Sequence, residues 1–179
     1  MIRTKLPQQK YLKECLRYES KTGKLFWKKR PLRHFVSRRW ANTWNTRWAG
    51  REALNYSEPD SYGYGSLDGV PLAAHRVVWK MVSGQEPPDL IDHKDRNKKN
   101  NKFKNLRAAN SSQNGLNRNL SKANKSGRTG VSYNARDRKW LAQLSFNGQV
   151  LFGGLFKNKR DAIQARAAIE SMVCGEFAQ

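Results

Sequence analysis

Apolar and polar residues follow two periods along the chain, and these periods predict most of its elements. The amino end predicts an amphipathic helix, because Pro7 precedes apolar residues at helical spacing: Tyr11, Leu12, Cys15, Leu16 and Tyr18. A turn at Thr22-Gly23 then leads into the apolar segment 24–28. The first region is therefore expected to be a helix that runs into a hairpin.

The middle of the chain predicts a hairpin, a helix and a buried strand in succession. Segment 63–72 turns at Asp68-Gly69, a pair that favours a tight β-turn. Residues 74–82 form an apolar stripe of helical period, and Gly84 supplies the stop. Pro87-Pro88 then forces an extended lead into a strand that begins at Leu90.

The last third predicts three strands, at 129–133, 140–146 and 150–156, with a hairpin turn at Asn147-Gly148. In the second strand Trp140, Ala142, Leu144 and Phe146 share one face, which needs a covering element. A helix starting at Asn158 is expected to supply that cover, with Asp161 returning a capping bond. Its apolar stripe is expected to be Ala162, Ala165, Ile169 and Met172.

Composition points to a polyanionic partner. The chain carries 35 Lys and Arg against 14 Asp and Glu, a net charge of +21, so it should repel itself unless a polyanion compensates. Its six Trp, six Tyr and seven Phe exclude wholesale disorder. A basic structural protein of the ribosomal kind would explain the charge equally well.

Length and cysteine content narrow the class further. No apolar run reaches the roughly 20 residues that span a bilayer, and the charged amino terminus lacks a signal-peptide core, so a soluble cytoplasmic protein is expected. Cys15 and Cys174 are far apart and outside any Cys-x-x-Cys pattern. They predict neither a disulfide nor a zinc site, and we expect both to be small buried hydrophobic residues.

The segment from Leu90 to Asn114 places an acid, an imidazole and carboxamides where a metal-dependent nuclease needs them. His93 can deprotonate water, since an unperturbed imidazole is largely neutral near pH ~7. Asp92 lies on the opposite face of the same strand. Asn114, in the following helix, can share a cation with Asp92, and such oxygen ligands suit Mg²⁺ or Mn²⁺ rather than zinc.

These residues, with Asn97, Asn100, Asn101 and the step Asn105-Leu106-Arg107, resemble the HNH motif of phage and intron homing endonucleases. The resemblance implies a ββα-metal fold that uses one divalent cation. It also implies catalytic roles for His93 as general base, Asn105 as organiser of the loop, and Asn114. Asp92 and Asn114 would be the metal ligands. The pair His75-Arg76 and the opening Tyr18-x-x-x-Thr22-Gly23-x-Leu25-x-Trp27 resemble the same proteins.

Each of these residues alone would have an ordinary structural explanation. Asp-His is a common dipeptide, and Asn-rich segments often form turns because Asn tolerates the left-handed backbone. Trp40, Trp44 and Trp48 are spaced by four, which is more typical of core packing than of base stacking. The Arg residues beside them keep a nucleic-acid role open.

The carboxyl-terminal third resembles the plant ethylene-response-factor (AP-two/ERF) DNA-binding domain. The resemblance is carried by Gly130-Val131-Ser132, Lys139-Trp140-Leu141-Ala142, Gly153-Gly154-Leu155-Phe156 and the helix from Asp161. It implies that a three-stranded sheet enters the DNA major groove. Together with basic residues nearer the nuclease motif, the DNA-contacting residues are expected to be Arg76, Arg107, Arg118, Lys122, Arg128, Tyr133, Arg136, Arg138, Trp140 and Gln143.

The fold expected is α+β, with a small ββα-metal nuclease module and a three-stranded antiparallel sheet packed on one helix. Its parts are a basic, aromatic region at 1–60, the nuclease module at 61–118, a linker at 119–126 and the DNA-binding domain at 127–179. We expect a phage-type HNH DNA endonuclease that is a monomer or weak dimer on double-stranded DNA. The alternatives are a non-catalytic DNA-binding regulator and a basic RNA- or ribosome-associated protein.

Overall fold

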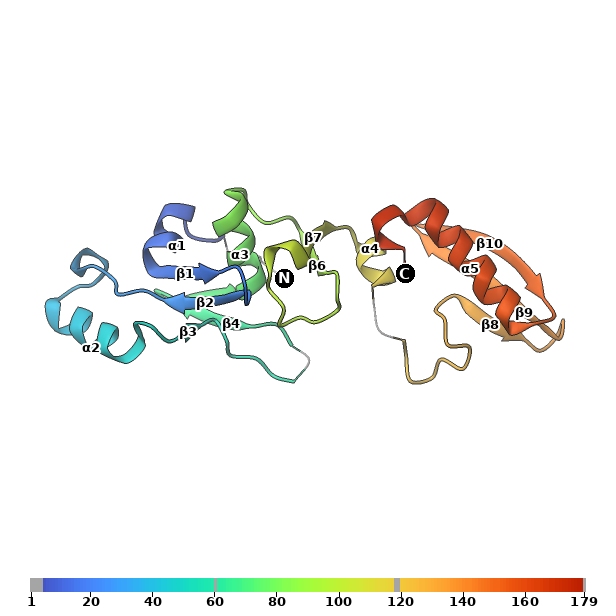
Figure 1. Cartoon of the computed structure of the whole chain (residues 1–179), viewed down its shortest axis with the longest axis horizontal. Helices are drawn as coiled ribbons and strands as arrows, with labels where there is room; N and C mark the ends of the chain where they lie inside the picture. The colour runs from blue at the N-terminus through green and yellow to red at the C-terminus, as the bar shows by residue number, and fades with distance from the viewer. Residues whose placement is uncertain (1–4, 60, 118–119, 179) are drawn as a thin grey trace. The chain divides into compact units, whose positions relative to one another are not determined.

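A computed structural model describes residues 5–59, 61–117 and 120–178. The chain is mixed α+β with small antiparallel sheets, and it divides into two compact units, Met1–Ala108 and Ala109–Gln179 (Figure 1). Each unit has a hydrophobic core of its own. Helix α4, which follows the predicted nuclease strands, belongs to the second unit because it packs with that unit's core.

The first unit begins with a helix and a three-stranded antiparallel sheet in the order β1-β2-β3. The predicted helix stripe was too long, because Leu16 and Tyr18 lie on a strand rather than on the helix. Gly23, at φ +80°, makes the turn between the first two strands. A second helix connects the hairpin to the short third strand. The bounds are α1 Gln9–Cys15, β1 Leu16–Glu19, β2 Lys24–Trp27, α2 Arg38–Trp48 and β3 Glu52–Ala53.

The next elements confirm the predicted hairpin and helix. Strands β4 (Tyr64–Leu67) and β5 (Val70–Ala73) pair antiparallel, with Leu67 opposite Val70 across the turn. Helix α3 (Ala74–Ser83) follows at once and ends at Gly84, whose φ of +78° is a left-handed conformation that glycine adopts without strain.

Strands β6 (Leu90–His93) and β7 (Leu106–Ala109) form a two-stranded sheet, with the short 3₁₀ helix η2 (Phe103–Asn105) just before β7. One core serves the whole first unit, from Leu6 to Leu106, with Leu12, Val77 and Val78 fully buried. So small a pair of strands cannot bury enough apolar surface alone. The amino-terminal elements therefore supply the hydrophobic support of β6 and β7.

The second unit consists of α4 (Ser111–Leu116), the antiparallel sheet β10-β9-β8 and helix α5. Asn110 caps α4 in a reciprocal capping box with Gln113. The turn at Asn147-Gly148 is confirmed, with both residues at positive φ. In Figure 1, α5 runs along the sheet, as predicted. The bounds are β8 Val131–Asn134, β9 Lys139–Phe146, β10 Gln149–Phe156 and α5 Lys159–Cys174.

Two expectations for α5 are wrong. Met172 is 84% exposed and does not join the apolar stripe. The Asn158 side chain makes no capping bond to the backbone; its amide donates to the Asp161 carboxylate at 3.3 Å, a stronger acceptor than a neutral group.

The buried face of α5 is partly ionic. Arg166 and Glu170 are both buried, and Arg166 Nη1 donates to Glu170 Oε2 at 2.6 Å. Arg128 Nη2, from the segment before β8, donates to the same oxygen at 2.7 Å.

Cys15 and Cys174 are free and buried, as expected. Within the described ranges, no helix combines the length and apolar character that crossing a membrane requires.

Candidate active site

Strand β6 ends in two buried side chains, the carboxyl group of Asp92 and the imidazole of His93. Asp92 is 5% exposed and His93 is 3% exposed. Arg107, on the paired strand β7, donates from Nε and from Nη2 to Asp92 Oδ2, each at 2.9 Å. This two-donor contact gives the buried carboxylate a cationic partner, and a buried charge without one would be costly. Arg107 was predicted to contact DNA, and here its guanidinium lies on the carboxylate.

His93 is held by a carboxamide from the loop between the two strands. Its Nε2 lies 3.1 Å from Oδ1 of Asn101, and both side chains are buried. An amide oxygen only accepts hydrogen bonds, so Nε2 carries the proton and Nδ1 is the basic nitrogen. Burial lowers the pKa of His93 below its usual value, against an opposing effect of the Asn101 bond. The imidazole is consequently neutral at cellular pH.

The loop that supplies Asn101 is tied together by Asn105. The Asn105 amide nitrogen donates to Asp95 Oδ1 at 2.9 Å and to the Asn100 carbonyl at 2.8 Å. Its amide oxygen accepts from the Asp95 backbone N–H at 3.1 Å. One buried carboxamide thus closes the loop from both sides, the geometry expected of a loop organiser.

An aromatic cluster covers the other side of His93. The His75 ring, from α3, lies 5.6 Å from that of His93, and the Tyr62 ring lies 4.7 Å from His75 and 5.8 Å from His93. Burial, together with the nearby His93 and Arg76, lowers the pKa of His75 to about 3. Nδ1 of His75 is buried without a hydrogen-bond partner. His75 is therefore a neutral packing residue beside the candidate base.

The amino-terminal hairpin contacts the same loop. Tyr18 Oη donates to the Asn101 carbonyl at 3.2 Å and accepts from the Phe103 N–H at 2.9 Å. At Gly23 a Cβ atom would lie 2.5 Å from the Lys102 nitrogen, so only glycine permits this approach. Sequence reasoning missed both contacts and the Asn101 bond to His93. The only sequence signal was the shared Tyr18-to-Trp27 opening.

The two oxygen donors that the sequence predicts as cation ligands belong to different units. Asp92 offers a carboxylate and Asn114, on α4, a carboxamide, and oxygen donors suit Mg²⁺ or Mn²⁺. Asn114 belongs to the second unit, whereas Asp92 belongs to the first. No cluster of three or more His, Cys, Asp or Glu occurs in the described ranges.

Two of the other predicted DNA-contacting residues near the strands can be placed. Arg76 donates from Nη1 to the Pro88 carbonyl at 3.0 Å and from Nη2 to the Pro87 carbonyl at 3.4 Å. It therefore anchors the lead into β6. Lys122 is exposed, while Arg118 lies outside the described residues.

The predicted sheet residues of the second unit divide into exposed and paired groups. Arg136 and Arg138 are exposed at the turn between β8 and β9, and Tyr133 is 53% exposed. Gln143 is half-buried on β9. Arg128 instead pairs with Glu170. Tyr133, Arg136 and Arg138 therefore lie at the same end of β8.

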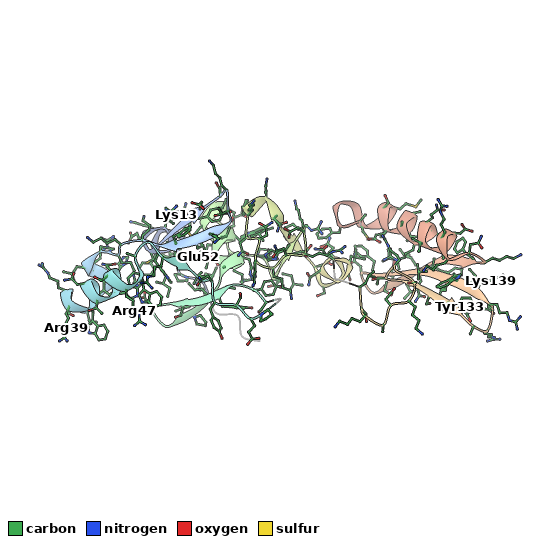
Figure 2. All side chains as sticks on the ribbon, turned by 60° about the horizontal axis from the view of Figure 1, so that its bottom comes forward. Lys13, Arg39, Arg47, Glu52, Tyr133 and Lys139 are labelled. Carbon is green, nitrogen blue, oxygen red and sulfur yellow. The ribbon has the colours of Figure 1, made fainter. Side chains whose placement is uncertain are left out.

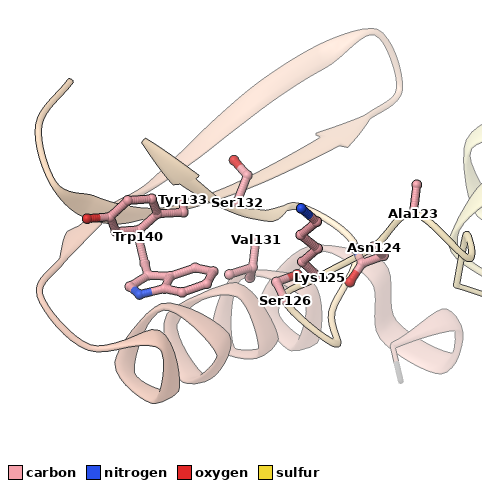
Figure 3. Close-up of a pocket in the computed structure, with 8 residues that line it drawn as sticks. All are labelled: Ala123, Asn124, Lys125, Ser126, Val131, Ser132, Tyr133 and Trp140. Atoms are coloured by element: carbon pink, nitrogen blue, oxygen red, sulfur yellow. Dashed lines mark hydrogen bonds between the residues drawn. The ribbon is translucent and has the colours of Figure 1, made fainter. Parts of the chain in front are cut away.

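Trp140 lies at the same end of the sheet, at an edge-to-face angle to Tyr133 with 5.3 Å between ring centroids. A groove of about 590 Å³ runs from these two rings past Val131 to Asn124 and Lys125 (Figure 3). Lys159 Nζ lies 5.7 Å from the Trp140 ring centroid. The half-buried Trp140 therefore packs against the core of the second unit and also lines this groove, which has Lys125 in its lining and Lys159 near the ring.

One segment of the chain matches a known protein family. Residues 72–116 match the family described as HNH endonuclease. The matched segment runs from β5 to α4 and includes Asp92, His93, Asn105 and Asn114. The match supports a nuclease, with DNA as the substrate and a divalent metal as is general for HNH nucleases. No curated protein and no solved structure matches the chain.

Proposed function

We propose that this chain is a homing-type HNH endonuclease of phage style that hydrolyses DNA phosphodiester bonds with one divalent cation, Mg²⁺ or Mn²⁺. His93 is the general base in this proposal. The observation that carries it is the buried His93, whose Nε2 lies 3.1 Å from Oδ1 of Asn101 and which follows Asp92 directly on β6.

In the hydrolysis, Nδ1 of His93 takes a proton from the attacking water. Asn101 keeps the ring in the tautomer that has its lone pair on this nitrogen. Asn105 acts one step away, since it closes the loop that carries Asn101. The neighbouring rings of His75 and Tyr62 exclude water from the flank of the imidazole, which favours its neutral form.

Asp92 and Asn114 would hold the cation, which would neutralise charge that develops on the phosphate and the leaving oxygen. Arg107 pairs with Asp92 and fixes the orientation of its carboxylate. Since the oxygen donors are few, the affinity for the free ion should be modest and should rise when DNA supplies further oxygens.

The second unit is proposed to recognise the DNA site through its three-stranded sheet, as an ethylene-response-factor type domain does. The exposed Tyr133, Arg136 and Arg138 at one end of β8 and β9 support this role. Arg and aromatic side chains on a sheet fit the width of the major groove. Arg128 is better described as a support for α5, since it pairs with the buried Glu170.

The test is cleavage by the His93→Ala variant beside the unmodified protein, on duplex DNA with and without Mg²⁺. Loss of general-base catalysis should slow cutting by roughly 10²–10⁴-fold while DNA affinity stays the same. Excess chelator should stop cutting by the unmodified protein and leave binding intact. Cutting by His93→Ala at the unmodified rate, or undiminished cutting in chelator, would contradict the proposal. Binding with no cutting in any metal would favour the DNA-binding regulator instead.

The recognition role has its own test in the full chain. The variant Arg136→Gln/Arg138→Gln should lose preference for the cognate site over unrelated duplex while keeping its cleavage rate at saturation. A matched charge change at the exposed pair Lys10 and Lys13, on α1, serves as the control. Unchanged preference in the Arg136/Arg138 variant would place recognition elsewhere in the chain.

A further inference from the structure

Helix α2 and the β4 strand present exposed aromatic rings that no hydrophobic core requires. Trp44, in the middle of α2, packs on Trp27 with 5.4 Å between ring centroids. Its helical neighbours Trp40 and Trp48, one turn away on each side, are 63% and 37% exposed. Across the unit, Tyr56 and Tyr64 are 74% and 41% exposed, and their backbones pair as a β-bridge. Four large rings of the first unit are thus exposed to solvent.

A groove connects three of these rings. It has a volume of about 290 Å³, and its lining includes Trp48, Tyr56 and Tyr64, with Trp44 also contributing. Arg30, Asp68 and Glu52 form the charged part of the same lining; Arg30 pairs with Asp68 at 2.9 Å, and Glu52 pairs with Lys24 at 2.8 Å. The groove therefore combines aromatic faces with a few polar groups, a lining that suits a planar heterocycle.

The surface beside the groove is cationic. Residues 20–51 contain no Asp or Glu, although ten Lys and Arg occur among them. Arg38, Arg39 and Arg47 are all exposed on α2, and Figure 2 shows the side chains of Arg39 and Arg47 on this helix. The guanidinium of Arg47 lies over the Trp48 ring at 5.2 Å from its centroid. Phosphate contacts and ring stacking are thus available on the same helix.

The aromatic row continues to the candidate base. The Tyr64 ring lies 6.4 Å from that of Tyr62, and the Tyr62 ring lies 5.8 Å from that of His93. Lys98, on the catalytic loop, places its ammonium 5.4 Å from the Tyr62 ring centroid. The half-buried Tyr62 therefore connects the exposed rings of the groove to the buried His93, along a path from α2 through β4 to the end of β6.

We propose that this path, Trp48-Tyr56-Tyr64-Tyr62, binds an unpaired segment of the DNA strand that His93 cuts. Bases stack on the rings, and the exposed arginines of α2 contact the phosphates. The inference rests on the proposed nuclease function and adds the substrate class, DNA with unpaired bases beside the scissile phosphate. Paired bases in a duplex hide their faces, so the exposed rings of Trp48, Tyr56 and Tyr64, with cations beside them, are suited to a single strand.

Binding is measured first, by fluorescence anisotropy in chelator, so that no cutting occurs. The probes are a labelled oligothymidylate and a labelled duplex of equal length. Tyr56→Ala and Trp48→Ala should each weaken single-strand binding about fivefold or more, as expected when one stacking platform is lost. Tyr56→Phe and Trp48→Phe keep an aromatic face and should restore most of the affinity. Duplex affinity should change by less than twofold in all four variants.

The cationic part is tested by the triple variant Arg38→Gln/Arg39→Gln/Arg47→Gln. Its matched control, Lys5→Gln/Lys10→Gln/Lys13→Gln, removes the same charge from exposed positions at the amino end. The α2 variant should lose more single-strand affinity than the control and should show a shallower salt dependence. Equal losses in the two triples, or equal losses on single strand and duplex, would overturn the proposal.

Cleavage gives the second measurement. A duplex with a short unpaired bubble beside the cut site should be cut faster than the fully paired duplex, and Tyr56→Ala should abolish that difference. A difference that persists in Tyr56→Ala would overturn the path. If no substrate is cut while the single-strand binding results hold, the nuclease function fails and the binding path stands.

Discussion

Burial of His75 should make the first unit sensitive to acid. The folded pKa is about 3 and the ordinary value is 6.5, so the unfolded chain binds the proton first as pH falls. The stabilising effect of the neutral ring is complete above pH 6.5 and is lost as pH falls toward 3. About pH 4.5 lies two pH units below the ordinary pKa, and each pH unit changes the free energy of unfolding by about 1.4 kcal/mol. The first unit should therefore lose about 2 to 3 kcal/mol of unfolding free energy at this pH.

The assay is urea unfolding followed by tryptophan fluorescence at about pH 7.5 and about pH 4.5. Five of the six tryptophans lie in Met1–Ala108, so the signal reports mainly on the first unit. His75→Phe keeps a ring against Tyr62 and His93 and removes the titrating group. Carboxylates and His93 titrate in both proteins, so the difference between the two isolates His75. Equal losses between the two pH values in both proteins would refute the reasoning.

Three other changes have expected outcomes. Asn101→Leu removes the bond that raises the pKa of His93, so the acid limb of the cleavage rate should move to lower pH while the maximal rate falls about 10- to 100-fold; a limb that moves upward would contradict the role of this bond. Gly23→Ala should cost about 1 to 3 kcal/mol of unfolding free energy and slow cleavage, because its Cβ meets the Lys102 backbone; Gly50→Ala, also at positive φ but with open space around it, is the control that separates the contact from the backbone strain. Glu170→Ala should lower the unfolding free energy of the second unit by about 3 kcal/mol, measured by circular dichroism, because Arg166 loses its buried partner; a loss under about 1 kcal/mol would show that the pair is dispensable.

Local signals in the sequence predicted much of the fold because each is satisfied within a few residues. Asp68-Gly69, Asn147-Gly148 and Gly84 need only the positive φ that the structure gives them. Strand β6 was predicted for a different reason, since its residues Asp92 and His93 belong to a motif whose spacing is short. These features require no knowledge of distant contacts.

The remainder depends on partners far apart in the chain. Asn101 was one of several asparagines in a polar loop, and only the folded arrangement distinguishes it as the partner of His93. Arg107 was read as a DNA contact, yet Asp92 is an acceptor within its reach. The repeat of Trp every four residues in α2 predicted packing for all three rings, although one helix face can bury only the central one against Trp27.

The contact of Gly23 and Tyr18 with the Asn101–Phe103 backbone determines which segments of the first unit have to stay together. The segment that matches the HNH family starts at residue 72, so the hairpin that braces the catalytic loop is outside it. A graft of the matched segment into another protein would transfer His93 without the hairpin that supports its loop. A chimaera of two related proteins joined near Ala108 should therefore fold and keep its activity, because the amino-terminal hairpin and the loop come from the same protein. A chimaera joined near residue 60 should fail, because the two come from different proteins.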